Sequence, residues 1–253
     1  MKKALFITQL FICTILLSRP LSMVAQGNDA ELYPTDSIVS KYHNDWTQNH
    51  YRKRIEIFRK NPLQYNEIVF IGNSITEQGR DWGDKFGMSN IRNRGISGDL
   101  TDGVLKRLEE IVHFEPNAVF LLIGINDLFN MYHKIDNARN LKYDKIVPSV
   151  AFIGKNILEI SKIIKKESPL TKVFVRTVLP TQREFLKDDI IKLNNIIREN
   201  ENKGYYKVID LYKGFVDRDG FLNKKLTIDG VHLSPEGYTK WVALEKPILK
   251  TLN

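Results

Sequence analysis

The sequence predicts an α/β protein with a largely parallel sheet covered by helices on both faces, and three observations support this. Short apolar runs such as 68–71 and 118–123 have the length and the unbroken hydrophobicity of buried strands. Longer segments with apolar residues at helical spacing lie between these runs, so strands and helices alternate along the chain. Both runs stop at a glycine followed by polar residues, as at the carboxyl end of a strand. Since internal repeats and low-complexity linkers are absent from the sequence, we expect one domain.

Residues 1–26 have the layout of a secretory signal peptide. Two lysines precede an apolar stretch, 4–17, that is too short to span a bilayer comfortably, and small residues near Ala25 offer a cleavage site. We therefore expect the protein to be exported to the periplasm or to the extracellular space. Cys13, the only cysteine, lies inside this stretch, so the exported chain would have no disulfide and no thiolate metal site.

The composition of the remaining chain excludes several classes of protein. About 225 residues remain after residues 1–26, enough for one domain with a substantial core, and the net charge falls from +8 to +5. The basic residues are spread along the chain and do not alternate with aromatic residues, which argues against nucleic-acid binding. No later apolar stretch approaches the length of a membrane span, so we expect no stable membrane insertion.

Residues 27–66 are expected to form a helical extension packed on the main domain, which we place at 67–253. Thr35 or Asp36 can cap a helix in this extension, and Pro62 ends the helical pattern. Four side chains at four-residue spacing predict a stripe that packs against the domain. These residues are Ile38, Tyr42, Trp46 and His50.

The main domain is expected to contain five strands with helices between them. The strands are predicted at 68–71, 91–94, 118–123, 172–177 and 206–211. Segments with helical periodicity and proline or glycine boundaries predict helices at 101–115, 148–168, 185–202 and 235–252. The segments 128–143 and 212–228 lack this periodicity and are expected to be connections, the first of them facing the substrate.

Polar residues that a packed core does not need follow three of the predicted strands. Ser74 follows the first strand, Gly98 the second and Asn126 the third, at the edge where open α/β sheets place their binding crevices. Ser74 is a candidate nucleophile. A simpler role is also open, because Ser74 or Thr76 could cap a following helix.

The end of the chain supplies the partners that a serine nucleophile needs. His232 is the natural base, because an imidazole titrates near neutral pH, and Asp229 could fix its tautomer from three residues earlier. Asn126 and the backbone N–H groups of Ser74 and Gly98 could stabilise a developing oxyanion. These residues predict serine hydrolysis that uses neither a metal nor an organic cofactor.

Other kinds of site have weaker support in the sequence. The string 217–220 partly resembles a calcium loop, but it lacks the acidic spacing and the terminal glutamate of such a loop. A nucleotide-binding protein with a doubly wound sheet would use the same strand ends, but the glycine-rich phosphate-binding motifs are missing. A non-catalytic carbohydrate-binding module would require the candidate catalytic residues to be vestigial.

Four short blocks resemble those of the SGNH hydrolases, the GDSL-type esterases. The first, Gly-Asn-Ser-Ile-Thr, is similar to the family's Gly-Asp-Ser-Leu block, and the third and fourth to its Gly-x-Asn-Asp and Asp-x-x-His blocks. The resemblance extends from about Ile68 to the C-terminus. The blocks lie at 72–76, 96–99, 124–127 and 229–232.

Two positions in the first block bear on this resemblance. Asn73 stands where the family has aspartate; asparagine keeps a hydrogen-bond acceptor, so we expect catalysis to be retained. Thr76 stands where a Gly-x-Ser-x-Gly motif would have its last glycine, which argues against the ordinary α/β-hydrolase elbow.

The resemblance implies a three-layer α/β/α, flavodoxin-like fold with a parallel sheet of about five strands in the order 2-1-3-4-5. It implies that Ser74 is the nucleophile, His232 the base and Asp229 its orienting acid, with Gly98 and Asn126 as oxyanion donors. We expect an exported esterase that hydrolyses short acyl esters, above all O-acetyl groups on carbohydrates, through an acyl-enzyme on Ser74. Phospholipids similar to platelet-activating factor, lysophospholipids and thioesters are the alternative substrates within this family.

Overall fold

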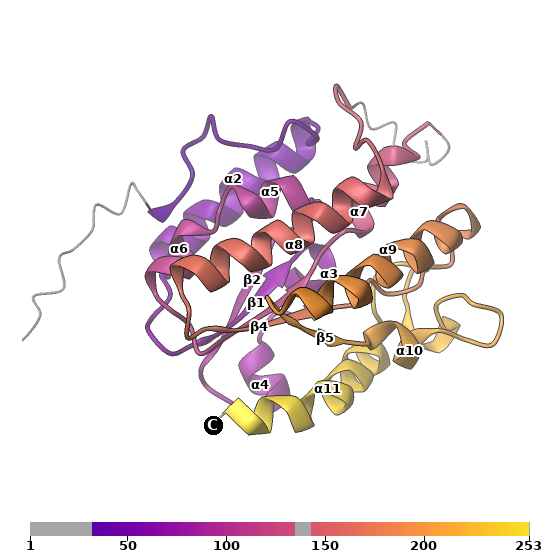
Figure 1. The fold of residues 1–253 in the computed structure, drawn as a ribbon. Helices are drawn as coiled ribbons and strands as arrows, with labels where there is room; N and C mark the ends of the chain where they lie inside the picture. The colour runs from indigo at the N-terminus through magenta and orange to yellow at the C-terminus, as the bar shows by residue number, and fades with distance from the viewer. Residues whose placement is uncertain (1–31, 135–142, 253) are drawn as a thin grey trace, which may run out of the picture.

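The computed structural model describes residues 32–134 and 143–252 of the chain. Within these residues a central sheet lies between two layers of helices (Figure 1). The three-layer α/β/α class predicted from the sequence is thus confirmed. The predicted signal peptide at 1–26 lies outside the described residues.

The sheet has five parallel strands in the order β2-β1-β3-β4-β5, as expected. Every residue of β1 and β3 is buried, because helices cover both faces, and this explains why these two strands appear in the sequence as unbroken apolar runs. Gly72 pairs with Gly95 at the ends of β1 and β2, so the segments that follow these strands emerge at one edge. The strands are β1 Ile68–Gly72, β2 Ile91–Gly95, β3 Ala118–Leu122, β4 Lys172–Arg176 and β5 Lys207–Ile209.

The helices divide between the two faces of the sheet (Figure 1). One layer contains α5 Thr101–Leu105, α6 Glu109–His113, α8 Val150–Glu167 and α9 Lys187–Asn200, and the other contains α4 Trp82–Phe86, α10 Leu211–Phe215 and α11 Pro235–Leu249. Three more helices lie before β1 or directly after a strand: α2 Asp45–Lys60, α3 Ser74–Glu77 and α7 Ile125–Met131. Short 3₁₀ turns occur at Glu184–Leu186, Glu201–Lys203, Lys224–Leu226 and Lys250–Leu252. No helix in the described part of the chain is long and apolar enough to cross a membrane.

The helix predicted at 101–115 is two short helices, α5 and α6. Arg107 lies in the interruption between them and is buried. Its guanidinium donates hydrogen bonds to the carbonyl oxygens of Arg94 and Gly72 and to the carboxylate of Asp99. These bonds join segments that are distant in the sequence, so local periodicity could not reveal them.

The stripe predicted for the N-terminal extension is wrong except at Tyr42, which is buried in the core of the domain. Helix α2 begins at Asp45, after the N-cap Asn44, whose side chain accepts a hydrogen bond from the Thr47 backbone N–H at 2.9 Å while Thr47 Oγ1 accepts one from the Asn44 N–H. Ile38 therefore precedes the helix and is exposed, and Trp46 is 54% exposed. The face of α2 that packs on the domain is formed instead by Thr47, Tyr51, Ile55 and Phe58.

A fully buried ion pair connects the sheet with α11. Arg176, the last residue of β4, binds both carboxylate oxygens of Glu245, with nitrogen–oxygen distances of 2.6 and 2.8 Å. It also donates to the Phe120 carbonyl oxygen at 3.1 Å, and its guanidinium carbon lies 4.1 Å from the centre of the Phe70 ring. Because both side chains are fully buried, each member of the pair depends on the other for its compensating charge.

Candidate active site

Ser74 lies in the first turn of α3, directly after β1. The preceding residue, Asn73, is the N-cap, and its Oδ1 accepts a hydrogen bond from the Ile75 N–H at 3.1 Å. The capping role that was open for Ser74 or Thr76 thus belongs to Asn73, which has the acceptor expected at this position. The hydroxyl of Ser74 is left for another partner, His232 Nε2, at 2.9 Å.

The structure brings Ser74, His232 and Asp229 together. His232 Nδ1 lies 2.7 Å from Asp229 Oδ2, and Asp229 Oδ1 accepts hydrogen bonds from the backbone N–H groups of His232 and Val231. Burial raises the pKa of Asp229, but these hydrogen bonds outweigh it and hold the pKa below its usual value. The carboxylate is therefore ionised at neutral pH and favours the tautomer with a proton on Nδ1. Nε2 is then free to accept the Ser74 proton.

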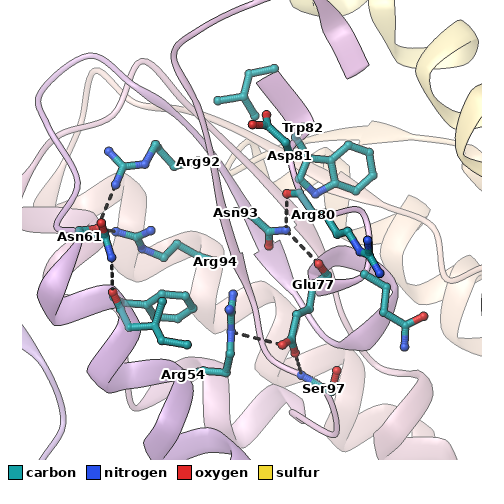
Figure 2. Close-up of a pocket in the computed structure, with 14 residues that line it drawn as sticks. Arg54, Asn61, Glu77, Arg80, Asp81, Trp82, Arg92, Asn93, Arg94 and Ser97 are labelled. Carbon is teal, nitrogen blue, oxygen red and sulfur yellow. Dashed lines mark hydrogen bonds and ion pairs between the residues drawn. The ribbon is translucent and has the colours of Figure 1, made fainter. Parts of the chain in front are cut away.

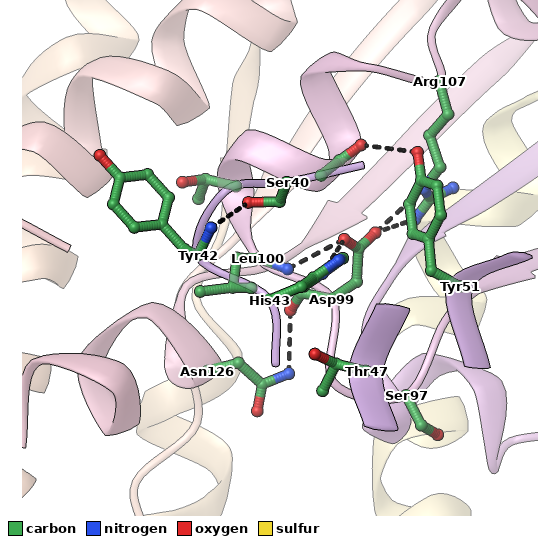
Figure 3. Close-up of polar contacts among 12 residues, drawn as sticks. Ser40, Tyr42, His43, Thr47, Tyr51, Ser97, Asp99, Leu100, Arg107 and Asn126 are labelled. Atoms are coloured by element: carbon green, nitrogen blue, oxygen red, sulfur yellow. Dashed lines mark hydrogen bonds and ion pairs between the residues drawn. The ribbon is translucent and has the colours of Figure 1, made fainter. Parts of the chain in front are cut away.

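Gly98 and Asn126 lie on the two neighbouring connections at the same edge of the sheet. Gly98 follows β2 with a φ of +82°, a conformation that favours glycine. Asn126 lies in the first turn of α7, and one N–H of its amide donates to the Asp99 carbonyl oxygen at 2.9 Å (Figure 3). The second N–H of that amide remains for a ligand, because Asn126 lines the same cavity as Ser74.

Asp99 supports the loop that contains Gly98 from within the protein. Its carboxylate is fully buried, binds the guanidinium of Arg107 at 2.9 and 3.0 Å, and accepts the Leu100 N–H at 3.0 Å (Figure 3). His43 Nε2 lies 3.5 Å from the other side of the carboxylate. No role was predicted for Asp99 although it stands in the second block, and nothing in the local sequence pattern pointed to His43 or Arg107.

A cavity of about 530 Å³ opens beside the three candidate catalytic residues. Helix α2, from the N-terminal extension, contributes three side chains to its wall. Phe129 and His133 also line the cavity, so the first part of the predicted connection 128–143 faces it. Residues 135–142 of this connection lie outside the described residues. The residues from α2 are Trp46, Thr47 and His50.

Residues 70–240 match the sequence model of the GDSL-like Lipase/Acylhydrolase family. The chain belongs to this family. Membership establishes a hydrolase that acts on esters, and it confirms the family resemblance of the four sequence blocks.

Relatives of this GDSL-family hydrolase include enzymes with different names. Platelet-activating factor acetylhydrolase IB subunit alpha1 of Rattus norvegicus is 28% identical over 226 residues, covering 86% of this chain and 88% of the rat protein. A GDSL-like lipase of Bacteroides thetaiotaomicron shares the fold, with a TM-score of 0.64 and 24% identity over 80% of this chain and 98% of its own. An acetylxylan esterase of Geobacillus stearothermophilus shares it with a TM-score of 0.57 and 16% identity, over 76% and 95% of the two chains.

The hydrolase has a second cavity, of about 660 Å³, which shares Gln78 and Ser97 with the first. Figure 2 shows residues that line this second cavity. Four arginines line it, and three of them, Arg54, Arg92 and Arg94, are each paired with a carboxylate. Arg92 binds Glu67 at 2.7 Å and Arg94 binds Glu110 at 2.6 Å. Their positive charge is therefore largely neutralised. No group of three or more histidine, cysteine or acidic residues in the described ranges is arranged to hold a metal ion.

Asp127, next to Asn126 in the hydrolase, is a buried carboxyl group that the sequence analysis did not single out. It is fully buried and accepts hydrogen bonds from the Thr101 hydroxyl at 2.6 Å and from the Thr101 backbone N–H. Burial raises the pKa of Asp127 to about 7, although the hydrogen bonds from Thr101 oppose that rise. The first turn of α7, which carries Asn126, is thus fixed by a group that titrates near neutral pH.

This raised pKa gives a pH dependence of stability. Between about pH 4 and about pH 7 the unfolded chain loses the Asp127 proton while the folded protein keeps it. The contribution to stability is therefore fully present below pH 4 and is lost as the pH rises to 7. Asp127→Asn cannot ionise, so its free energy of unfolding relative to wild type is expected to rise by a few kcal/mol across this range.

Urea unfolding of both proteins at several pH values would measure the effect. The exposed carboxylate of Asp188 offers a matched control, because Asp188→Asn is expected to follow the wild-type profile. Parallel profiles for Asp127→Asn and wild type would contradict the assignment.

Proposed function

We propose that this protein is a serine esterase that hydrolyses short acyl esters, above all acetyl esters, through an acyl-enzyme on Ser74. The observation that carries the proposal is the continuous chain of contacts from Ser74 Oγ to His232 Nε2 at 2.9 Å and from His232 Nδ1 to Asp229 at 2.7 Å. In this arrangement the serine proton has an acceptor, and the charge that then forms on the imidazole has a carboxylate beside it.

The mechanism follows from these positions. Ser74 Oγ attacks the ester carbonyl carbon while His232 Nε2 takes its proton. The negative oxygen of the tetrahedral intermediate accepts hydrogen bonds from the Ser74 and Gly98 N–H groups and from the Asn126 amide. His232 then protonates the departing alcohol, and later activates the water that releases the acid and restores the serine.

The proposed natural substrate is an O-acetylated carbohydrate outside the cytoplasm. The signal-peptide layout of residues 1–26 supports export. The mixture of polar and aromatic side chains in the cavity supports a carbohydrate, since Thr47, Gln78 and Asn126 line it beside Trp46. The fold shared with an acetylxylan esterase is consistent with this choice.

A phospholipid that carries an acetyl group is the second candidate substrate. The rat relative is named as a platelet-activating factor acetylhydrolase. In addition, Leu100, Phe129 and Val231 give the cavity an apolar part that could accommodate the neighbouring lipid. Both candidates share the acetyl group and differ in the alcohol to which it is attached.

Hydrolysis of p-nitrophenyl esters from acetate to octanoate, with acetate release from acetylated xylo-oligosaccharides and from platelet-activating factor, tests the proposal. We expect kcat/KM to fall by about ten-fold or more from acetate to octanoate, because added methylenes must find room in a preformed site. Acetate release is expected from the sugar. A maximum of kcat/KM at longer acyl chains would contradict the preference for acetyl esters. Acetate release from platelet-activating factor alone would favour the second candidate substrate. A protein that hydrolyses none of these esters would contradict the proposed esterase activity.

A further inference from the structure

Trp46 differs from the other two tryptophans of the chain in its exposure. Trp82 and Trp241 are buried in the core, whereas Trp46 is 54% exposed. It lies in the first turn of α2 and lines the same cavity as Ser74 and His232. A large aromatic side chain left open at a catalytic cavity contributes little to the core, so its position calls for another role.

The indole of Trp46 is held in a fixed orientation. It stacks on the imidazole of His50, with ring centres 5.4 Å apart and planes within 1° of parallel. His50 Nε2 is in turn 2.9 Å from Glu77 Oε2, and Glu77 also accepts the Ser97 N–H and lies 3.4 Å from Arg54 Nε (Figure 2). With one face against His50, the exposed surface of the indole is presented to the cavity and to solvent.

The negative charge of Glu77 strengthens its contact with His50, which holds the indole of Trp46. Burial raises the pKa of its carboxyl group, but hydrogen bonds from His50 and Ser97 and the positive charge of Arg54 outweigh that effect and lower the pKa overall. Glu77 is therefore ionised at neutral pH and anchors His50 beneath the indole.

The indole edge lies close to the expected position of the ester carbonyl. A Cβ atom added to Gly98 would lie 3.2 Å from Trp46 Cζ3 and 2.4 Å from Thr47 Cγ2. Helix α2 therefore packs directly against the loop that contains Gly98. An ester whose carbonyl oxygen is bound by the Gly98 N–H would therefore have the rest of the molecule next to the indole.

We propose that Trp46, positioned by His50, is a stacking platform for a sugar ring of the acetylated substrate. The inference rests on the proposed esterase function and specifies its alcohol. A sugar ring has an apolar C–H face and a polar rim, and the cavity offers an aromatic face with Thr47 and Gln78 nearby as hydrogen-bonding groups. A rigid platform favours such a ring over a flexible acyl chain, because little conformational freedom is lost on binding.

Iodide quenching of tryptophan fluorescence tests this contact without catalysis. In the Ser74→Ala protein, iodide is expected to quench mainly Trp46, since the other two tryptophans are buried. An acetylated xylo-oligosaccharide is expected to abolish most of this quenching, and a Ser74→Ala/Trp46→Phe protein to lack the quenchable signal from the start. Quenching that is unchanged up to the solubility limit of the sugar would overturn the inference.

Kinetics supply a second test that separates binding from a structural role. Trp46→Ala is expected to lower the ratio of kcat/KM for the acetylated sugar to kcat/KM for ethyl acetate, which has no ring, by about ten-fold, mainly through KM. Trp46→Tyr should restore most of the ratio. An equal loss on both esters would mean that Trp46 only braces Gly98, and it would overturn the inference.

Tyr205 provides a matched control, because it is an exposed aromatic residue just before β5. It therefore lies at the amino end of a strand, whereas the cavity lies at the carboxyl ends. Tyr205→Ala is expected to leave both rates unchanged. The two proposals can fail separately. Sugar protection of Trp46 in a protein that hydrolyses no ester would contradict the esterase alone, whereas hydrolysis of ethyl acetate without such protection would contradict the platform alone.

Discussion

Replacing Ser74 by alanine is expected to lower kcat for p-nitrophenyl acetate by about 10³-fold or more. The hydroxyl is the nucleophile of the proposed mechanism, and neither His232 nor the oxyanion donors can form the acyl-enzyme in its place. The fold should survive, because Asn73 rather than Ser74 caps α3 and the substitution removes only the hydrogen bond to His232. Steady-state kinetics and the thermal midpoint of both proteins measure the two parts of this expectation.

Labelling identifies the nucleophile independently of turnover. A serine-directed phosphonate is expected to modify wild-type protein at Ser74, as located by mass spectrometry, and to leave Ser74→Ala unmodified. Ser97 lines the same cavity and is the informative alternative, because its backbone N–H donates to Glu77, whereas His232 Nε2 lies beside Ser74 Oγ. A label on Ser97, or near-normal turnover of Ser74→Ala, would rule out the proposed mechanism.

Glu245→Ala is expected to lower the free energy of unfolding by about 3–5 kcal/mol, the largest stability effect that we predict. Glu245 and Arg176 are fully buried and bind each other through two nitrogen–oxygen contacts. Removal of the carboxylate leaves the guanidinium charged in the core among Phe70, Phe120 and Trp241, because arginine does not lose its proton. Urea unfolding, with its slope checked for two-state behaviour, would measure the change.

Two further variants separate the cost of an uncompensated charge from the loss of contacts. Arg176→Met combined with Glu245→Leu removes both charges and is expected to recover most of the lost stability, since buried pairs can often be replaced by apolar residues. Glu56→Ala disrupts the exposed pair with Arg59 and is expected to cost no more than about 1 kcal/mol. A loss for Glu245→Ala as small as that of Glu56→Ala would contradict the importance of the buried pair.

The parts of the fold that could be predicted are those that the local sequence encodes. The strands at 68–71 and 118–123 were recognisable because a parallel strand covered on both faces must be apolar throughout. Their carboxyl ends share one edge of the sheet, so the residues that follow them could be expected near one another. The segment 212–228 was less well predicted, because the five-residue helix α10 that overlaps its start is too short to show a periodicity.

Features that depend on contacts between distant segments could not be predicted. The stripe in the N-terminal extension was assigned one residue away from the true buried face, because the helix begins at Asp45 instead of near Thr35. Asp127 has its unusual pKa because it is completely buried beside Thr101, and nothing in its immediate sequence indicates that burial. The first error concerned where a helix begins, whereas the second concerned the position of another element.

The separation of Ser74 and His232 along the chain has a consequence for biosynthesis. The two residues lie 158 positions apart, and the serine directly follows β1, which is hydrogen-bonded to β2 and β3. These three strands can associate while the segment that carries the histidine has yet to be translated. A nascent chain therefore holds the proposed nucleophile without the proposed base, and in the proposed mechanism ester cleavage begins only after residue 232 has been made. Hydrolysis would thus count only the chains that contain both residues, whereas strand content would also count shorter ones.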